Sequence, residues 1–134
     1  MNYNNYKLII VIGLPGSGKT TYCKKYIKTH ILYDDFIPFF YNGNIINNLL
    51  SKKNIVVNDP RLCNFNTFKL YMEIFEKYVV KKDILLVLFE NEKDKCLKNI
   101  MIESKKDSEI YNSKFYNTKK YNKYNNIIIP VYSK

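Results

Sequence analysis

Residues 7–20 read KLIIVIGLPGSGKT, an apolar run that leads directly into a cluster of glycines. Three of the four glycines in the chain, Gly13, Gly16 and Gly18, fall within six residues. The run Leu8–Ile12 is mostly β-branched, which is typical of a strand buried on both faces. After the glycines, apolar side chains recur at helical spacing. The stretch therefore predicts a buried strand, a glycine turn and an amphipathic helix.

The turn Gly13–Thr20 fits G-x-x-x-x-G-K-T, the Walker A phosphate-binding pattern. Glycines allow successive backbone N–H groups to turn toward an anion, and the following helix adds its free N–H groups. Lys19 is expected to reach the β- and γ-phosphates of a nucleotide, and the Thr20 hydroxyl to coordinate Mg²⁺. The alternative is an ordinary strand-to-helix turn with an incidental lysine.

Carboxylates follow two of the predicted strands. Asp34 and Asp35 come after the strand at 31–33, and Asp59 follows the apolar run NIVVN at 54–58. Because ligands of open α/β sheets bind at the carboxyl ends of strands, Asp59 is a candidate Mg²⁺ ligand. Asp35 is the candidate general base for an attacking hydroxyl, with Asp34 as the other possibility. The alternative for both sites is an acidic surface turn.

Arg61 is the only arginine in the chain and is a candidate for contacting transferred phosphate. An arginine with no functional role is the alternative. The segment 98–123 is rich in lysine and is a candidate lid over the phosphates; a solvated face is the competing interpretation. The lysines considered for this lid are Lys98, Lys105, Lys106, Lys114, Lys119 and Lys120.

Composition limits the class of protein. The 134 residues predict one domain, spanning 1–134, and 46% of them are hydrophobic, as in an ordinary packed core. No apolar run is long enough for a membrane span, and the N-terminus lacks a signal-peptide layout. Three separated cysteines and a single histidine favour neither a disulfide framework nor a zinc site. An intracellular, reducing location, cytoplasmic or nuclear, is expected.

The formal net charge of +10 invites a nucleic-acid interpretation. However, the chain contains no Ala, Gln or Trp and is crowded with Asn, Lys, Ile and Tyr, whose codons are A/T-rich. An A/T-rich genome, such as that of a large DNA virus or a protist, explains much of the lysine excess. The same bias makes a cluster of glycines, whose codons are G/C-rich, more informative.

Strands and helices are expected to alternate along the chain. Besides the first strand, strands are predicted at 31–33, 54–58, 84–89 and 127–131. Helices are predicted at 19–30, at 45–50, around the apolar spacing of 68–79 with Asn64 or Asn66 as candidate N-cap, after Asn91 and around 108–115. Such alternation implies right-handed crossovers and a parallel sheet. Pro130 lacks a backbone donor, so the last strand should lie at a sheet edge.

With these motifs in place, the whole chain resembles the small P-loop kinases, a group that includes adenylate-kinase-like enzymes, polynucleotide 5′-hydroxyl kinases and zeta-toxin-like enzymes. The resemblance implies a three-layer α/β/α P-loop NTPase fold with a five-stranded parallel sheet in the order 2-3-1-4-5. It implies ATP and Mg²⁺ as cofactors, bound by Gly16, Ser17, Gly18, Lys19, Thr20 and Thr21. Asp35 matches the hydroxyl-activating aspartate of the polynucleotide kinases. The chain departs from them at 36–38, where it has Phe-Ile-Pro in place of a nearby arginine, and it has no lid arginines.

The sequence therefore predicts an ATP- and Mg²⁺-dependent phosphotransferase that acts on a nucleotide or a nucleic-acid 5′-hydroxyl. Lys19, Asp35 and Arg61 are its expected catalytic residues. Two alternatives remain: a kinase for a small non-nucleotide metabolite, and a nucleotide-binding module that acts through a protein or nucleic-acid partner. No membrane partner is expected, and a monomer is favoured.

Overall fold

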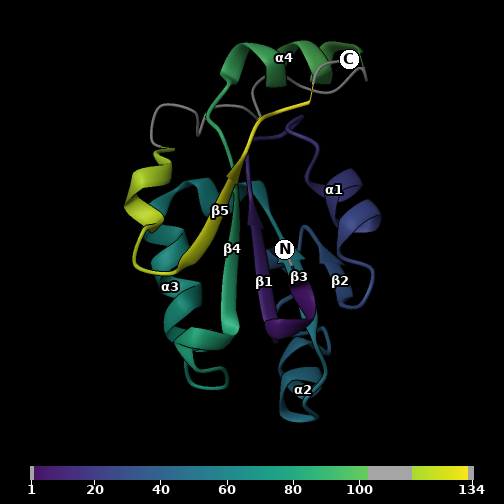
Figure 1. The fold of residues 1–134 in the computed structure, drawn as a ribbon, viewed down its shortest axis with the longest axis vertical. Coiled ribbons are helices and arrows are strands. Elements are labelled where there is room, and N and C mark those ends of the chain that lie inside the picture. The colour runs from purple at the N-terminus through teal and green to yellow at the C-terminus, as the bar shows by residue number, and fades with distance from the viewer. Residues whose placement is uncertain (1, 103–115, 133–134) are drawn as a thin grey trace.

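A computed structural model describes residues 2–102 and 116–132 (Figure 1). Its five strands form one sheet in which every pairing is parallel, in the order β2-β3-β1-β4-β5. The strands are β1 (Leu8–Ile12), β2 (Ile31–Asp34), β3 (Ile55–Asn58), β4 (Ile84–Phe89) and β5 (Asn125–Ile129). The predicted α/β class, parallel sheet and strand order are confirmed.

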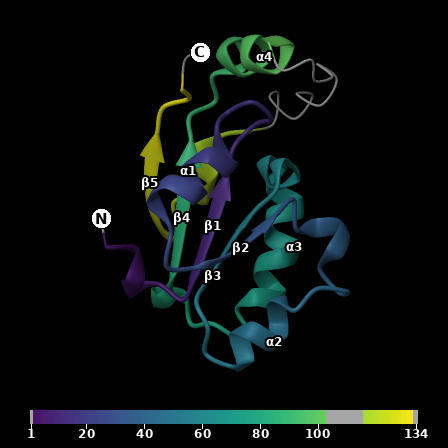
Figure 2. The same cartoon turned by 90° about the vertical axis from the view of Figure 1, so that its right-hand side faces the viewer.

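The helices connect these strands. They are α1 (Lys19–Tyr26), α2 (Ile45–Leu50), α3 (Phe65–Phe75) and α4 (Lys93–Ile102), with 3₁₀ turns η1 (Tyr3–Asn5), η2 (Ile37–Phe39), η3 (Pro60–Cys63), η4 (Lys81–Asp83) and η6 (Thr118–Tyr121). Helix α1 lies on one face of the sheet, whereas α2 and α3 lie on the other (Figure 2). This arrangement follows from right-handed crossovers, because the chain moves across the sheet in opposite directions before and after β2. Helix α4 lies beyond the carboxyl ends of the strands (Figure 1).

The central strands form the core. All residues of β1, β3 and β4 are buried, which explains why these strands read as continuous apolar runs. The edge strands β2 and β5 are only partly covered. On the α3 face, an aromatic cluster joins Phe36, Phe40, Tyr71 and Phe75 through ring centroids 5.3–6.0 Å apart. This packing fixes the segment that follows β2 against the body of the protein.

Two predicted helix boundaries were wrong by several residues. Helix α1 ends at Tyr26 because Ile27 leaves the helical conformation, with φ −118° and ψ 62°, and buries its side chain. Helix α3 begins at Phe65 because the side chain of Asn64 accepts hydrogen bonds from the backbone N–H groups of Asn66 and Thr67. One of the two candidate N-caps, Asn64, is thus confirmed, whereas the helix ends at Phe75 rather than at 79.

Strand β5 lies at the sheet edge, as Pro130 predicted. The strand itself covers 125–129 rather than 127–131, and Pro130 follows its last residue. The proline therefore ends the strand instead of lying within it.

Several predictions concern residues outside the described ranges. These include the helix expected around 108–115 and Lys105, Lys106 and Lys114 of the candidate lid. Of the remaining lid lysines, Lys98 belongs to α4, and Lys119 and Lys120 belong to η6. The three cysteines are buried and form no disulfide, as expected. No helix within residues 2–102 and 116–132 has both the length and the apolar character needed to cross a membrane.

Candidate functional site

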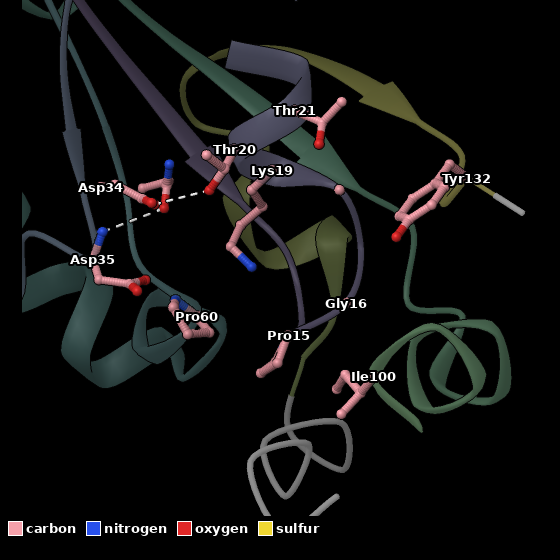
Figure 3. Close-up of a pocket in the computed structure, with 12 residues that line it drawn as sticks. Pro15, Gly16, Lys19, Thr20, Thr21, Asp34, Asp35, Pro60, Ile100 and Tyr132 are labelled. Carbon is pink, nitrogen blue, oxygen red and sulfur yellow. Dashed lines mark hydrogen bonds between the residues drawn. The ribbon is translucent and has the colours of Figure 1, made fainter. Parts of the chain in front are cut away.

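The glycine loop, residues 13–18, connects β1 to α1 at the carboxyl end of the sheet (Figure 3). Gly16 and Gly18 have positive φ angles of 83° and 101°, in the region that favours glycine. A Cβ atom on Gly16 would lie 2.4 Å from the carbonyl oxygen of Cys96. Gly18 is the N-cap of α1, so the free N–H groups of this eight-residue helix begin at the loop. Backbone conformation and space thus both require these two glycines.

Lys19, the first residue of α1, follows this loop and lies in an unusual environment for a cation. Its side chain is buried, and Nζ donates a hydrogen bond of 3.0 Å to the carbonyl oxygen of Leu14. Within the described part of the chain, no carboxylate forms an ion pair with Lys19. Burial lowers the pKa of Lys19 from its ordinary value, although nearby Asp35 and Asp34 oppose this effect. A bound anion would compensate this desolvated charge.

Thr20 contacts the end of the neighbouring connection. Its Oγ1 donates a hydrogen bond of 3.0 Å to Oδ1 of Asp34, the last residue of β2 (Figure 3). This pair brings together a hydroxyl and a carboxylate from segments 14 residues apart in sequence. Such oxygen atoms are the ligand types that Mg²⁺ takes from proteins, usually one or two carboxylates together with substrate phosphates and water. The residues present therefore fit a Mg²⁺ ion, with Asp34 as the carboxylate beside Thr20.

Asp35 follows Asp34, and both residues line a cavity at the glycine loop. Its φ angle is +46°, uncommon for a residue other than glycine, and its backbone N–H lies 3.4 Å from Oδ1 of the buried Asn58. Partial loss of hydration raises the pKa of Asp35, and the negative charges of Asp34 and Asp59 raise it further. A carboxylate with a raised pKa is a stronger proton acceptor, as a general base requires.

Asp59 and Arg61 are bound to each other rather than to the glycine loop. The fully buried Asp59 accepts from the Arg61 backbone N–H at 2.9 Å, from Nη1 of Arg61 at 3.0 Å and from the Ile37 backbone N–H at 3.1 Å. Neither Asp59 nor Arg61 is among the residues that line the cavity at the glycine loop. The Asp59 carboxylate holds η3 and the segment after Asp35 in place.

A cavity of about 470 Å³ connects most of these groups (Figure 3). The residues that line it are Pro15, Gly16, Gly18, Lys19, Thr20, Thr21, Asp34, Asp35, Asn58, Pro60, Ile100 and Tyr132. Among the predicted site residues, Gly16, Gly18, Lys19, Thr20, Thr21 and Asp35 are thus brought together. Gly13 and Ser17 belong to the loop but do not line this cavity.

A second cavity of about 580 Å³ adjoins the first and shares Gly18, Thr21 and Tyr132 with it. Its other lining residues are Ser17, Tyr22, Lys25, Tyr26, Phe89, Ile129 and Pro130. The lining is mainly aromatic and aliphatic. Ser17 Oγ is buried and has no hydrogen-bond partner among the described residues. This cavity can therefore offer flat apolar contacts, and Ser17, Thr21 and Lys25 add polar groups to its lining.

Sequence reasoning did not identify Tyr132, Asn58 or Ile100 as site residues. Asn58 could have been found from its place at the end of the predicted strand 54–58, where the neighbouring Asp59 was the candidate instead. Tyr132 lies just beyond the last strand. Its only signal in the sequence was this position, since ligands of open α/β sheets bind at the carboxyl ends of the strands. Ile100 belongs to the helix expected after Asn91, and its apolar side chain gave no signal that this helix borders a cavity.

No family model matches the chain. Comparison with curated proteins shows 47% identity over 97 residues to uncharacterized protein R277 of Acanthamoeba polyphaga mimivirus. The aligned region covers 70% of each of the two chains. This relative comes from a giant virus, and a large DNA virus is one of the two A/T-rich sources, with a protist, that the amino-acid composition suggests. At this identity and coverage, the chain belongs to the same family as the mimivirus protein R277.

Proposed function

We propose that the protein is an ATP- and Mg²⁺-dependent phosphotransferase of the small P-loop kinase type. The proposal rests mainly on the buried ammonium of Lys19, which follows the glycine loop at the N-terminus of α1. No carboxylate among the described residues forms an ion pair with it. Burying a cation is costly unless an anion compensates it. The phosphates of a nucleotide would do so, and the strand–loop–helix context is the one in which the Walker A pattern binds them.

The two adjoining cavities suit the two halves of a nucleotide, its phosphates and its base. Backbone N–H groups at the start of α1 and Lys19 would hold the phosphates in the first cavity. The adjoining cavity would accept the base between aromatic side chains, with Tyr132 at the junction. Thr20 and Asp34 would hold Mg²⁺, which would offset charge on the transferring phosphoryl group. Asp34 takes this role in the proposal because Asp59, the carboxylate expected from the sequence, is bound to Arg61.

The acceptor group is proposed to be a hydroxyl. Asp35 would accept its proton as the acceptor oxygen bonds to the γ-phosphorus and the bond to the β-phosphate oxygen breaks, releasing ADP. The charges around the cavity support this choice. Lys19 is the one cation among the described lining residues, and with Asp34 assigned to Mg²⁺ the carboxylate left for the acceptor is that of Asp35. An ionised carboxylate would repel a phosphate acceptor. A nucleic-acid 5′-hydroxyl remains the preferred acceptor, and the hydroxyl of a small metabolite is the alternative.

One observation favours a second candidate function, a nucleotide-binding module with little catalysis. The single arginine is held by Asp59 at 3.0 Å and does not line the cavity, so the described site lacks a guanidinium to stabilise the transition state. Such a module would bind ATP and transfer its phosphate slowly or not at all.

Transfer of the labelled γ-phosphate from ATP separates these functions. The purified protein is offered 5′-hydroxyl oligonucleotides, nucleoside monophosphates and sugars. Transfer to the oligonucleotides that Asp35→Asn abolishes supports the proposal. Transfer to monophosphates alone would contradict the hydroxyl assignment, and ATP binding without transfer to any acceptor would favour the binding module.

A further inference from the structure

A buried amide connects the glycine loop to two other segments. Asn99 is on α4, and its side chain is only 2% exposed. Its Nδ2 donates to the carbonyl oxygen of Gly16 at 2.9 Å and to that of Tyr132 at 3.1 Å. Both hydrogens of the amide are therefore used, one on the loop and one on the segment after β5.

Close packing surrounds this amide. The backbone of α4 approaches Gly16 so closely that an added Cβ would lie 2.4 Å from the Cys96 carbonyl oxygen. The ring of Tyr132 lies against Gly18, where an added Cβ would be 2.8 Å from its Cδ1. At the start of α4, Oε2 of Glu92 accepts from the backbone N–H of Val131 at 2.8 Å. Helix α4, the glycine loop and residues 131–132 thus form one packed unit, with Asn99 at its centre.

We infer that Asn99 is a positioning residue that holds the glycine loop in the conformation that binds phosphate. The inference rests on the proposed function, because it assigns Asn99 to the nucleotide-binding site. A peptide unit is planar, so a hydrogen bond to the Gly16 carbonyl also fixes the plane of the Ser17 N–H, which donates to the Leu14 carbonyl at 3.1 Å and closes the loop. A loop fixed before binding loses less conformational entropy when the anion arrives.

The same side chain links the two cavities. Tyr132 lines both of them, and its carbonyl is the second acceptor of Asn99. Asn99 itself is not a lining residue of either cavity, so it acts through Gly16 and Tyr132 rather than by touching the nucleotide. Its loss should therefore weaken the binding of phosphate and of whole nucleotide alike.

The test compares Asn99→Asp and Asn99→Leu with the unmodified protein. Both substitutions keep the approximate size of the side chain and remove the two donors. Titration calorimetry measures the Kd for Mg²⁺·ATP and for inorganic tripolyphosphate, at a temperature where circular dichroism shows the variants folded. We expect both Kd values to rise about tenfold or more, the effect of losing about 1.4 kcal/mol of binding free energy.

Asn91→Asp is the matched control. Asn91 Nδ2 also donates to a backbone carbonyl, but to that of Tyr116, at 3.0 Å, rather than to one in the glycine loop. Its Kd values should stay within about twofold of the unmodified protein. If Asn99 only stabilised the fold, its substitution would lower the number of binding sites per chain. The Kd of the molecules that remain folded would then be unchanged.

The outcomes are distinguishable. Unchanged Kd values in folded Asn99 variants would overturn the positioning role while leaving the proposed function intact. Absence of binding by the unmodified protein would overturn the proposed function itself, and the positioning role with it. If neither variant folds, hydrogen exchange of the unmodified protein decides the matter. Tripolyphosphate should then slow amide exchange in 93–100 together with 13–20, and protection confined to the loop would contradict the inference.

Discussion

Asp35 shows how one residue can favour function over stability. Its φ of +46° is an unfavourable backbone conformation for a residue other than glycine. Its raised pKa indicates that the fold does not stabilise the ionised carboxylate. Asparagine tolerates this backbone conformation and carries no charge. We therefore expect Asp35→Asn to raise the melting temperature at pH 7 while it abolishes phosphate transfer. ATP affinity should stay unchanged, since Asp35 is assigned to the acceptor.

The pH dependence of Asp35 gives a second measure of the same residue. Because its folded-state pKa is raised, the native state holds this proton to higher pH than the unfolded chain, whose aspartates titrate near pH 3.9. The stabilising effect of Asp35→Asn should therefore be absent at pH 3 and appear as the pH rises through the folded-state pKa. Melting curves of both proteins across this range would test it; a constant difference between them would contradict the assignment.

His30 provides a separate pH effect on stability. Its Nε2 lies 2.7 Å from the Tyr6 carbonyl and its Nδ1 lies 3.0 Å from Thr29 Oγ1, an arrangement that suits a neutral ring. Burial lowers the pKa of His30 below 6.5, its ordinary value. The unfolded chain then binds the proton more readily, so stability should fall as the pH drops through about 6.5. Denaturant unfolding between pH 7.5 and 5.5 should show this slope, and His30→Gln should flatten it.

At the scale of elements, the contact between the glycine loop and α4 leaves less room for an added Cβ than the surroundings of the other three glycines do. Gly16→Ala would place a methyl group 2.4 Å from the Cys96 carbonyl and would force an L-residue to φ +83°. The backbone cost alone is about 1–2 kcal/mol. We expect a clear fall in melting temperature and a loss of ATP binding.

Gly43→Ala is the control for this substitution. Gly43 lies in the connection after η2, and its added Cβ would meet only the Phe39 carbonyl, at 3.0 Å. This variant should lose less stability and keep its ATP affinity. An equal loss of ATP affinity in the two variants would contradict the importance of the close contact between Gly16 and α4 for ATP binding.

At the scale of the whole molecule, much of the fold follows from sequence pattern. Continuous apolar runs identify the central strands, and the alternation with helices gives the parallel sheet. The strand order came from the resemblance to P-loop kinases, and Pro130 supported the edge position of β5. Element ends were less predictable, because they depend on one residue leaving the helical conformation, as at Ile27, although Asn64 was correctly among the candidate caps.

The candidate site was predictable only in part. A local pattern could indicate the glycine loop because its residues are adjacent in sequence. The choice between Asp34 and Asp59 beside Thr20 depends on how separate connections pack, and no spacing in the sequence encodes it. The same reason explains why Asn99 and Tyr132 were missed, since their contacts with the loop join segments far apart in the chain.

The central claim is that the glycine loop and Lys19 bind the phosphates of ATP. Its most direct test is the thermal stability of the protein and of Lys19→Met, with and without Mg²⁺·ATP. Removing a buried, desolvated cation should leave the ligand-free variant at least as stable as the unmodified protein. Mg²⁺·ATP at 100 times its Kd should stabilise the unmodified protein by about 2.7 kcal/mol and Lys19→Met hardly at all. Equal stabilisation of the two proteins, or none in either, would contradict the account.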